Sequence, residues 1–185
     1  STQSWVNPYL AIAALDAMAA GASAEHALES VLGTDEGRNL RQLGVVDARG
    51  GVAHWTGDHC TPWAGQMKAR GYTVQGNMLT GPAVLQAMAA AFAGSEPLDL
   101  AERLMLALEA GQKAGGDKRG RQSAALKVYG AEDYPLIFTI AQLQLSPFVA
   151  GMPRKGHPAG SLPEAVTSML LTPPPYRPGG GGSAP

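Results

Sequence analysis

Two pairs of helices, separated by short strands, are the strongest pattern in this sequence. Apolar residues recur at helical spacing in two regions, and each region holds two helices joined by a short turn. The first pair is predicted to start at Asn7-Pro8 and to stop at Gly33. The second is predicted to start at Gly81-Pro82 and to stop at Gly111. A fold for this chain must therefore place two separate helix pairs.

The segments between and around the helices change to strand-like patterns. A β-hairpin is predicted from Arg41–Asp47 and Gly51–Thr56, which are rich in Val, Leu and Trp. Tyr72–Gln75 is predicted as a third strand, reached through a loop, and Ser123–Tyr129 as a later one. A helix pair covers one face of a sheet, so two pairs can cover two faces. Residues 1–135 are therefore predicted to form one α+β domain with its helices outside.

The end of the chain differs in composition from this domain. Residues 136–151 (LIFTIAQLQLSPFVAG) are apolar without clear turn signals, and prolines follow them. Residues 136–170 are predicted to be a divergent C-terminal segment. Residues 171–185 are rich in proline and glycine, which is typical of a disordered tail.

Charge and cysteine content narrow the classes of protein. The net charge of −1 gives no reason to expect nucleic acid or an anionic membrane as a partner. No apolar run is long enough to span a bilayer. The single cysteine, Cys60, cannot form an internal disulfide, which favours a reducing compartment and predicts a cytoplasmic protein.

A glycine-rich turn before the last predicted strand concentrates polar side chains. Its two arginines could bind a carboxylate or phosphate through paired N–H donors, and its acid could orient one of them. The alternative is a solvated turn, because charged turns usually face water. The candidate substrate-binding residues are Asp117, Arg119, Arg121, Gln122 and Ser123.

Val74–Leu79 is a second candidate site. A strand that ends in Gly-Asn exposes backbone N–H groups, and Asn77 adds an amide side chain. Such donors could form an oxyanion hole, which stabilises charge on a carbonyl oxygen. The alternative is a plain turn, since Asn and Gly are common there.

Asp58, His59 and Cys60 stand together in the loop after the hairpin. The other histidines show no ligand spacing that would complete a zinc site, so no metal is predicted. A Cys–His nucleophile pair ranks below the loop interpretation, because adjacent side chains on an extended chain point apart. No glycine-rich phosphate loop occurs either, and no cofactor is predicted.

Ser1 and Thr2 are candidates for a different kind of nucleophile. A free N-terminal Ser or Thr can attack a carbonyl with its own α-amino group as the base. The amino group suits that task because its pKa lies near neutrality. The alternative is that Ser1 marks a fragment boundary.

Four phrases in order, TQSWVNP, LRQLGVVDARGGVAHWTGDHCTPWAG, YTVQGNMLTGP and GGDKRGRQSAAL, carry a family resemblance. The sequence closely resembles the bacterial and archaeal domain-of-unknown-function family numbered 1028. That resemblance implies an N-terminal-nucleophile (Ntn) hydrolase-like fold, a four-layer αββα sandwich. Members carry roughly one more strand pair before the position of Thr2. The resemblance therefore implies a sandwich that is incomplete at the N-terminus, with Ser1 in a mid-domain position if those strands are missing.

The resemblance implies an amidohydrolase that acts on a small amide or acyl substrate. Asn77 would then hold the oxyanion, and Arg121 with Asp117 would position an anionic substrate. The alternative is a non-catalytic binding or structural module that keeps the sandwich without the nucleophile. A homo-oligomer, or a partner chain that supplies the N-terminal strands, is a further expectation.

Overall fold

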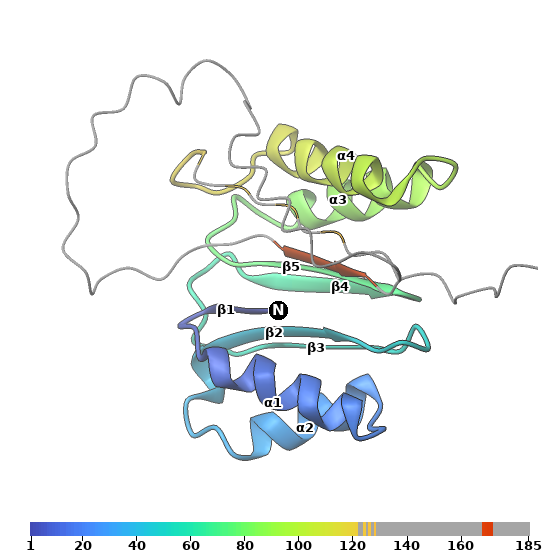
Figure 1. Ribbon diagram of the computed structural model, residues 1–185. Coiled ribbons are helices and arrows are strands. Elements are labelled where there is room, and N and C mark those ends of the chain that lie inside the picture. The colour runs from blue at the N-terminus through green and yellow to red at the C-terminus, as the bar shows by residue number, and fades with distance from the viewer. Residues whose placement is uncertain (122–123, 125, 127, 129–167, 172–185) are drawn as a thin grey trace, which may run out of the picture.

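A computed structural model of the protein describes residues 1–121, 124, 126 and 128, and the backbone of residues 168–171. Figure 1 shows four layers, in which one helix pair, two sheets and a second helix pair follow one another. The α+β class and both predicted helix pairs are confirmed. The helices are α1 (Pro8–Ala19), α2 (Ala24–Gly33), α3 (Ala83–Gly94) and α4 (Leu100–Lys113), and Arg38–Leu40 forms a short 3₁₀ helix.

Within the described part of the chain, the strands form two antiparallel sheets of three strands each. The first has the order β1-β2-β3, and the second has the order β4-β5-β6. In the first sheet Gln3 pairs with Gln42, and Gly44 pairs with His54. The strands are β1 (Thr2–Ser4), β2 (Arg41–Val46), β3 (Val52–Thr56), β4 (Gly65–Ala69), β5 (Tyr72–Gly76) and β6 (Ser168–Leu171).

Each sheet packs its apolar face against its own helix pair. Leu43, Val45 and Ala53 of the first sheet join Leu10, Leu28 and Val31 of α1 and α2 in one core. Val74 of β5 joins the buried side chains of α3 and α4 in the other core, which contains Val84, Leu85, Met88, Phe92 and Leu104. Because strand side chains alternate between faces, the residues between these apolar positions must face the opposite sheet.

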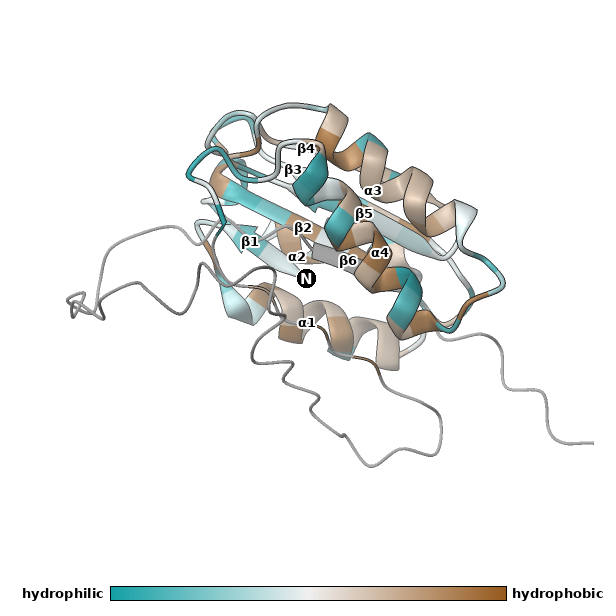
Figure 2. Cartoon of the chain, turned by 90° about the horizontal axis from the view of Figure 1, so that it is seen from above, coloured by the Kyte–Doolittle hydropathy of each residue, from teal (hydrophilic) through white to brown (hydrophobic). Residues whose placement is uncertain are grey.

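The faces that the two sheets turn toward each other are polar. We call this layer the polar interlayer. In Figure 2 strand β1 is pale to teal, whereas α1 and α3 are mostly brown. Most sandwiches fill this space with apolar side chains, so the polar interlayer is the feature that a functional account must explain. Its members are Gln3, Gln42, Gly44, His54 and Thr56 from the first sheet, and Gln66, Lys68, Thr73 and Gln75 from the second.

The helix starts agree with the predicted caps. Asn7 accepts a hydrogen bond from the backbone N–H of Tyr9 at 3.2 Å, and Ser23 accepts one from His26 at 3.2 Å. The predicted end of the fourth helix at Gly111 is wrong, because α4 continues to Lys113. A Cβ atom at Gly111 would lie 2.7 Å from Cγ of Met88, so this glycine allows close packing of α3 on α4.

Two strands were not predicted. Gly65–Ala69 was expected to be part of a loop but forms β4. The last three residues of β4 are exposed, and no residue of this strand is β-branched, so its own sequence favours a strand only weakly. Its pairing with β5 makes it a strand despite this weak local propensity. β6 spans the expected boundary between the divergent segment and the tail. Most of the strand predicted at Ser123–Tyr129 lies outside the described residues.

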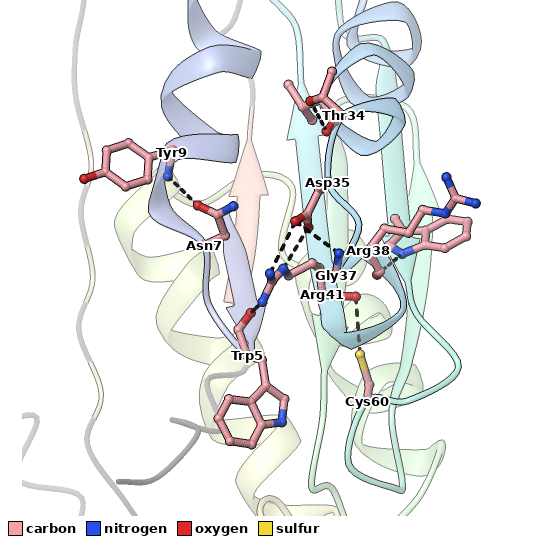
Figure 3. A network of polar contacts seen from close by, with 11 residues as sticks. Trp5, Asn7, Tyr9, Thr34, Asp35, Gly37, Arg38, Arg41 and Cys60 are labelled. Atoms are coloured by element: carbon pink, nitrogen blue, oxygen red, sulfur yellow. Dashed lines mark hydrogen bonds and ion pairs between the residues drawn. The ribbon is translucent and has the colours of Figure 1, made fainter. Parts of the chain in front are cut away.

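The Arg41 side chain connects the start of β2 to the segment after α2 by a salt bridge and to the residue after β1 by a hydrogen bond. In Figure 3 the Arg41 guanidinium lies between the Asp35 carboxylate, with an Nε to Oδ2 distance of 2.8 Å, and the carbonyl oxygen of Trp5, 2.6 Å from Nη1. The guanidinium lowers the pKa of Asp35 through a hydrogen bond and its charge. No helix among the described residues is long and apolar enough to cross a membrane.

The hairpin turn after β2 is tied to the start of α2 by a buried carboxylate. Asp47 accepts hydrogen bonds from the backbone N–H groups of Ala24 at 3.0 Å, Arg49 at 2.8 Å and Gly51 at 2.9 Å. These donors lower the pKa of Asp47, first through Ala24 and Gly51. The carboxylate therefore joins the helix layer to the sheet.

We expect Asp47→Asn to lower the free energy of unfolding by roughly 2 kcal/mol at neutral pH, because an amide nitrogen cannot accept these bonds. Folding lowers the pKa of Asp47 below its unfolded-state value of 3.8. The stabilisation by this carboxylate is therefore present above pH 3.8 and is lost as the pH falls through the pKa of the folded state. Urea unfolding at pH 7 and pH 3 measures both effects. Asp58→Asn, at an exposed position, is the control. An equal loss for both variants would contradict this role.

Candidate functional site

Buried side-chain amides without partners mark the polar interlayer as the candidate site. Gln3 is 1% exposed and Gln75 is fully buried. Neither the oxygen nor the nitrogen of either amide has a hydrogen-bond partner in the described part of the chain. A buried polar atom without a partner costs roughly 1–3 kcal/mol, and native proteins hold few of them. Two such amides on facing sheets suggest that a ligand completes their hydrogen bonds.

Gln42 is the satisfied counterpart of these glutamines. Its Nε2 lies within 3.0 Å of three acceptors, which are Oγ1 of Thr56 and the carbonyl oxygens of Gly65 and Gly76. Its Oε1 accepts a hydrogen bond from Nδ2 of Asn77 at 3.2 Å. Because Gly65 and Gly76 belong to the second sheet, Gln42 connects the two sheets and has a structural role.

Gly44 allows the sheets to approach each other beside Gln75. A Cβ atom at Gly44 would lie 2.7 Å from Oε1 of Gln75 and 2.9 Å from Cγ2 of Thr73. The Gln75 amide therefore points at the middle strand of the opposite sheet. Gly44 leaves the space that this amide occupies.

Ser1 and Thr2 lie on opposite faces of the first sheet. The Ser1 amino group donates a hydrogen bond to the Gly44 carbonyl at 2.8 Å, so Ser1 stands opposite Gly44 on the interlayer face. Thr2 pairs with Leu43, whose side chain belongs to the core beneath α1 and α2. Burial lowers the pKa of the Ser1 amino group from 8.0 to about 6. Of the two predicted nucleophiles, only Ser1 faces the buried amides.

The structure brings the two polar turns of the sequence together. The backbone N–H of Lys118 donates to the carbonyl of Met78 at 2.9 Å, and that of Thr80 donates to Gly116 at 3.0 Å. Asn77, just before this contact, is 1% exposed, and its Oδ1 has no partner among the described residues. The turn at residues 115–121 therefore lies beside the segment that follows Asn77 at the end of β5.

Arg119 is already paired within this turn. Its Nη2 lies 2.8 Å from Oδ2 of Asp117 and its Nε lies 3.0 Å from Oδ1, a bidentate ion pair. This pairing raises the pKa of Arg119. The N–H groups on Nε and Nη2 of Arg119 therefore already donate to Asp117. Arg121 is exposed. The other two predicted substrate contacts, Gln122 and Ser123, lie outside the described residues.

The Asp58-His59-Cys60 loop shows no site. Asp58 and His59 are exposed, whereas Cys60 is buried and its thiol donates to the carbonyl of Arg41 at 3.3 Å. Burial raises the pKa of Cys60, so the thiol stays protonated at neutral pH. Within the described ranges no three His, Cys, Asp or Glu side chains are grouped to hold a metal ion.

Sequence reasoning missed Gln3, Gln42 and Gln75. The signal was present, because a glutamine stands beside an apolar or small residue in each of TQS, RQLG and TVQG. Strand alternation could have assigned these glutamines to one face. It could not have shown that this face meets a second sheet.

Comparison with known proteins agrees with the architecture. The model of a family described as "Family of unknown function (DUF1028)" matches residues 1–144. The crystal structure of protein SPO2555 from Silicibacter pomeroyi, assigned to the same family, is similar with a TM-score of 0.60 and 33% sequence identity. The match covers 63% of this chain and 51% of that one, so the chain spans about half the length of this relative. No curated protein matches the sequence.

Proposed function

We propose that this chain, which belongs to the DUF1028 family of unknown function, forms an amide-bond hydrolase domain of the Ntn type. The observation that carries the proposal is the buried, unpartnered amides of Gln3 and Gln75 in the polar interlayer. A carboxamide offers one acceptor and two donors, which complement the N–H and C=O groups of a substrate amide. The helix–sheet–sheet–helix order supports an Ntn-hydrolase-like sandwich.

We assign the attack to Ser1, because its strand face is the one that Gln75 approaches across Gly44. The Ser1 hydroxyl oxygen forms a bond to the substrate carbonyl carbon. In a chain whose first residue is Ser1, the amino group takes the hydroxyl proton, since its pKa of about 6 leaves it unprotonated at neutral pH. The C–N bond then breaks, the leaving amine takes that proton, and water hydrolyses the acyl-enzyme.

In this proposal Gln75, and not Asn77 as the sequence predicts, donates the hydrogen bond to the developing oxyanion. Asn77 is bonded to Gln42, which lies two residues along β2 from Gly44. Two residues of a strand span about 7 Å, so Asn77 stands away from the level of Ser1. It stabilises the position of Gln42 and the end of the interlayer.

An acylating probe tests this assignment. After incubation with the p-nitrophenyl ester of N-acetylglycine, intact and peptide mass spectrometry should find one acyl group on Ser1. Ser1→Ala should remove this adduct, and Thr2→Ala should keep it. An added residue before Ser1 should also prevent labelling while leaving the circular dichroism spectrum unchanged. An adduct that persists in Ser1→Ala contradicts the assignment, and probe binding without any adduct favours a binding module.

A further inference from the structure

One end of the polar interlayer carries basic side chains. It is the end at which the β2–β3 turn meets the β4–β5 turn, through a hydrogen bond from the backbone N–H of Gly71 to the carbonyl of Gly50 at 3.2 Å. Cγ of Arg70 lies 3.9 Å from the position of a Cβ atom at Gly50. This end lies opposite the Asn77 end, because the strands run between the two.

His54 and Lys68 face each other just inside this end. His54 pairs with Gly44 in the first sheet, and Lys68 pairs with Thr73 in the second. Thr73 approaches Gly44 between the sheets. His54 on β3 and Lys68 on β4 are the strand partners of these two residues, so their side chains face each other across the interlayer. Burial, and then the charge of Lys68, lower the pKa of His54. Nδ1 of His54 is buried and has no partner among the described residues.

No carboxylate of the described residues neutralises this end. The ion pairs among the described residues join Asp35, Glu109 and Asp117 to Arg41, Lys113 and Arg119, and none of them involves Lys68. Asp47, the acid of the adjoining turn, is occupied by backbone N–H groups on the helix side of the sheet. The exposed Lys68 ammonium group therefore lies beside an imidazole whose Nδ1 is buried, an arrangement that attracts an anion.

We propose that Lys68 and His54 bind a carboxylate of the substrate while Gln75 binds its amide. Gln75 lies two residues along β5 from Thr73, the partner of Lys68, a separation of about 7 Å along the strand. A carboxylate and an amide joined through one carbon atom bridge this distance when a hydrogen bond of about 3 Å is added at each end. The substrate class is thus a small N-acyl amino acid or a short peptide with a free C-terminus, an inference that rests on the proposed function.

Isothermal titration calorimetry with two matched probes tests the carboxylate site. The probes are N-acetylglycine and its neutral counterpart, N-acetylglycinamide. The unmodified protein should bind the carboxylate about tenfold more tightly, which corresponds to about 1.4 kcal/mol. Lys68→Met should remove this preference and leave the affinity for the neutral probe unchanged. Lys113→Met removes the same charge from the outer face of α4 and should keep the preference.

Equal affinity for both probes, or a preference that survives Lys68→Met, would overturn the carboxylate site. So would the absence of binding by either probe. These outcomes are separate from the acyl-adduct experiment. An adduct on Ser1 without carboxylate preference leaves the hydrolase proposal standing alone, and a preference lost in Lys68→Met without any adduct supports the carboxylate site alone.

Discussion

Replacing Gln42 with leucine is expected to lower the free energy of unfolding by roughly 3 to 5 kcal/mol, more than the loss expected for Asp47→Asn. The Gln42 amide donates hydrogen bonds to the carbonyl groups of Gly65 and Gly76 and to the Thr56 hydroxyl, and it accepts one from the Asn77 amide. Leucine has a similar volume but no polar atoms, so the Gly65 and Gly76 carbonyl groups and the Asn77 amide would lose these hydrogen bonds, whereas the Thr56 hydroxyl keeps its bond to Gln66. Urea unfolding monitored by circular dichroism measures the change.

Gln3→Leu is the matched control for this experiment. Gln3 pairs with Gln42 on the adjacent strand, points to the same face and is equally buried. It makes no hydrogen bond to a described residue, so leucine removes an unsatisfied amide and should leave stability unchanged or slightly raised. A similar loss for both variants would show that burial alone, and not the Gln42 network, sets the cost.

Gln75→Met is expected to slow acylation of the protein by roughly 100-fold, the loss typical of removing one oxyanion donor. Methionine preserves the length of the side chain but cannot donate a hydrogen bond to the substrate carbonyl. The acylation rate would be measured by mass spectrometry with the p-nitrophenyl ester of N-acetylglycine. Gln86→Met, on the exposed side of α3, makes the same exchange away from the interlayer and should leave the rate unchanged.

The same Gln75 variant should keep or raise the stability of the fold. The buried amide of Gln75 has no partner among the described residues, so its removal should raise the free energy of unfolding by up to about 2 kcal/mol. A functional residue is expected to show this opposition between stability and activity. A variant that loses stability and acylation together would instead indicate a structural amide.

The helices were predictable because their signals are local. Asn7-Pro8 and Ser23 begin α1 and α2 through caps that can be read within four residues of sequence. β4 was missed because pairing with β5, and not its own residues, makes it a strand. The boundary at Gly111 was misplaced because the contact with Met88 lies on another helix.

The candidate site was predictable only in part, because some of its residues are marked by local composition and others only by contacts between distant segments. The turns that carry Asn77 and Asp117 stood out by composition, and the structure does bring them together. Gln3 and Gln75 look like ordinary strand residues until the two sheets are stacked. Their importance depends on the approach of one sheet to the other, such as that of Gln75 to Gly44, which no local pattern in the sequence reveals.

Nuclear magnetic resonance of the side-chain amides tests the central claim, that the polar interlayer is a ligand site, most directly. During a titration with N-acetylglycinamide, the NH₂ resonances of Gln3 and Gln75 should shift and saturate together. The resonances of exposed Gln86 should not move. Unchanged Gln3 and Gln75 resonances at a high probe concentration, or equal shifts at Gln86, would contradict the claim.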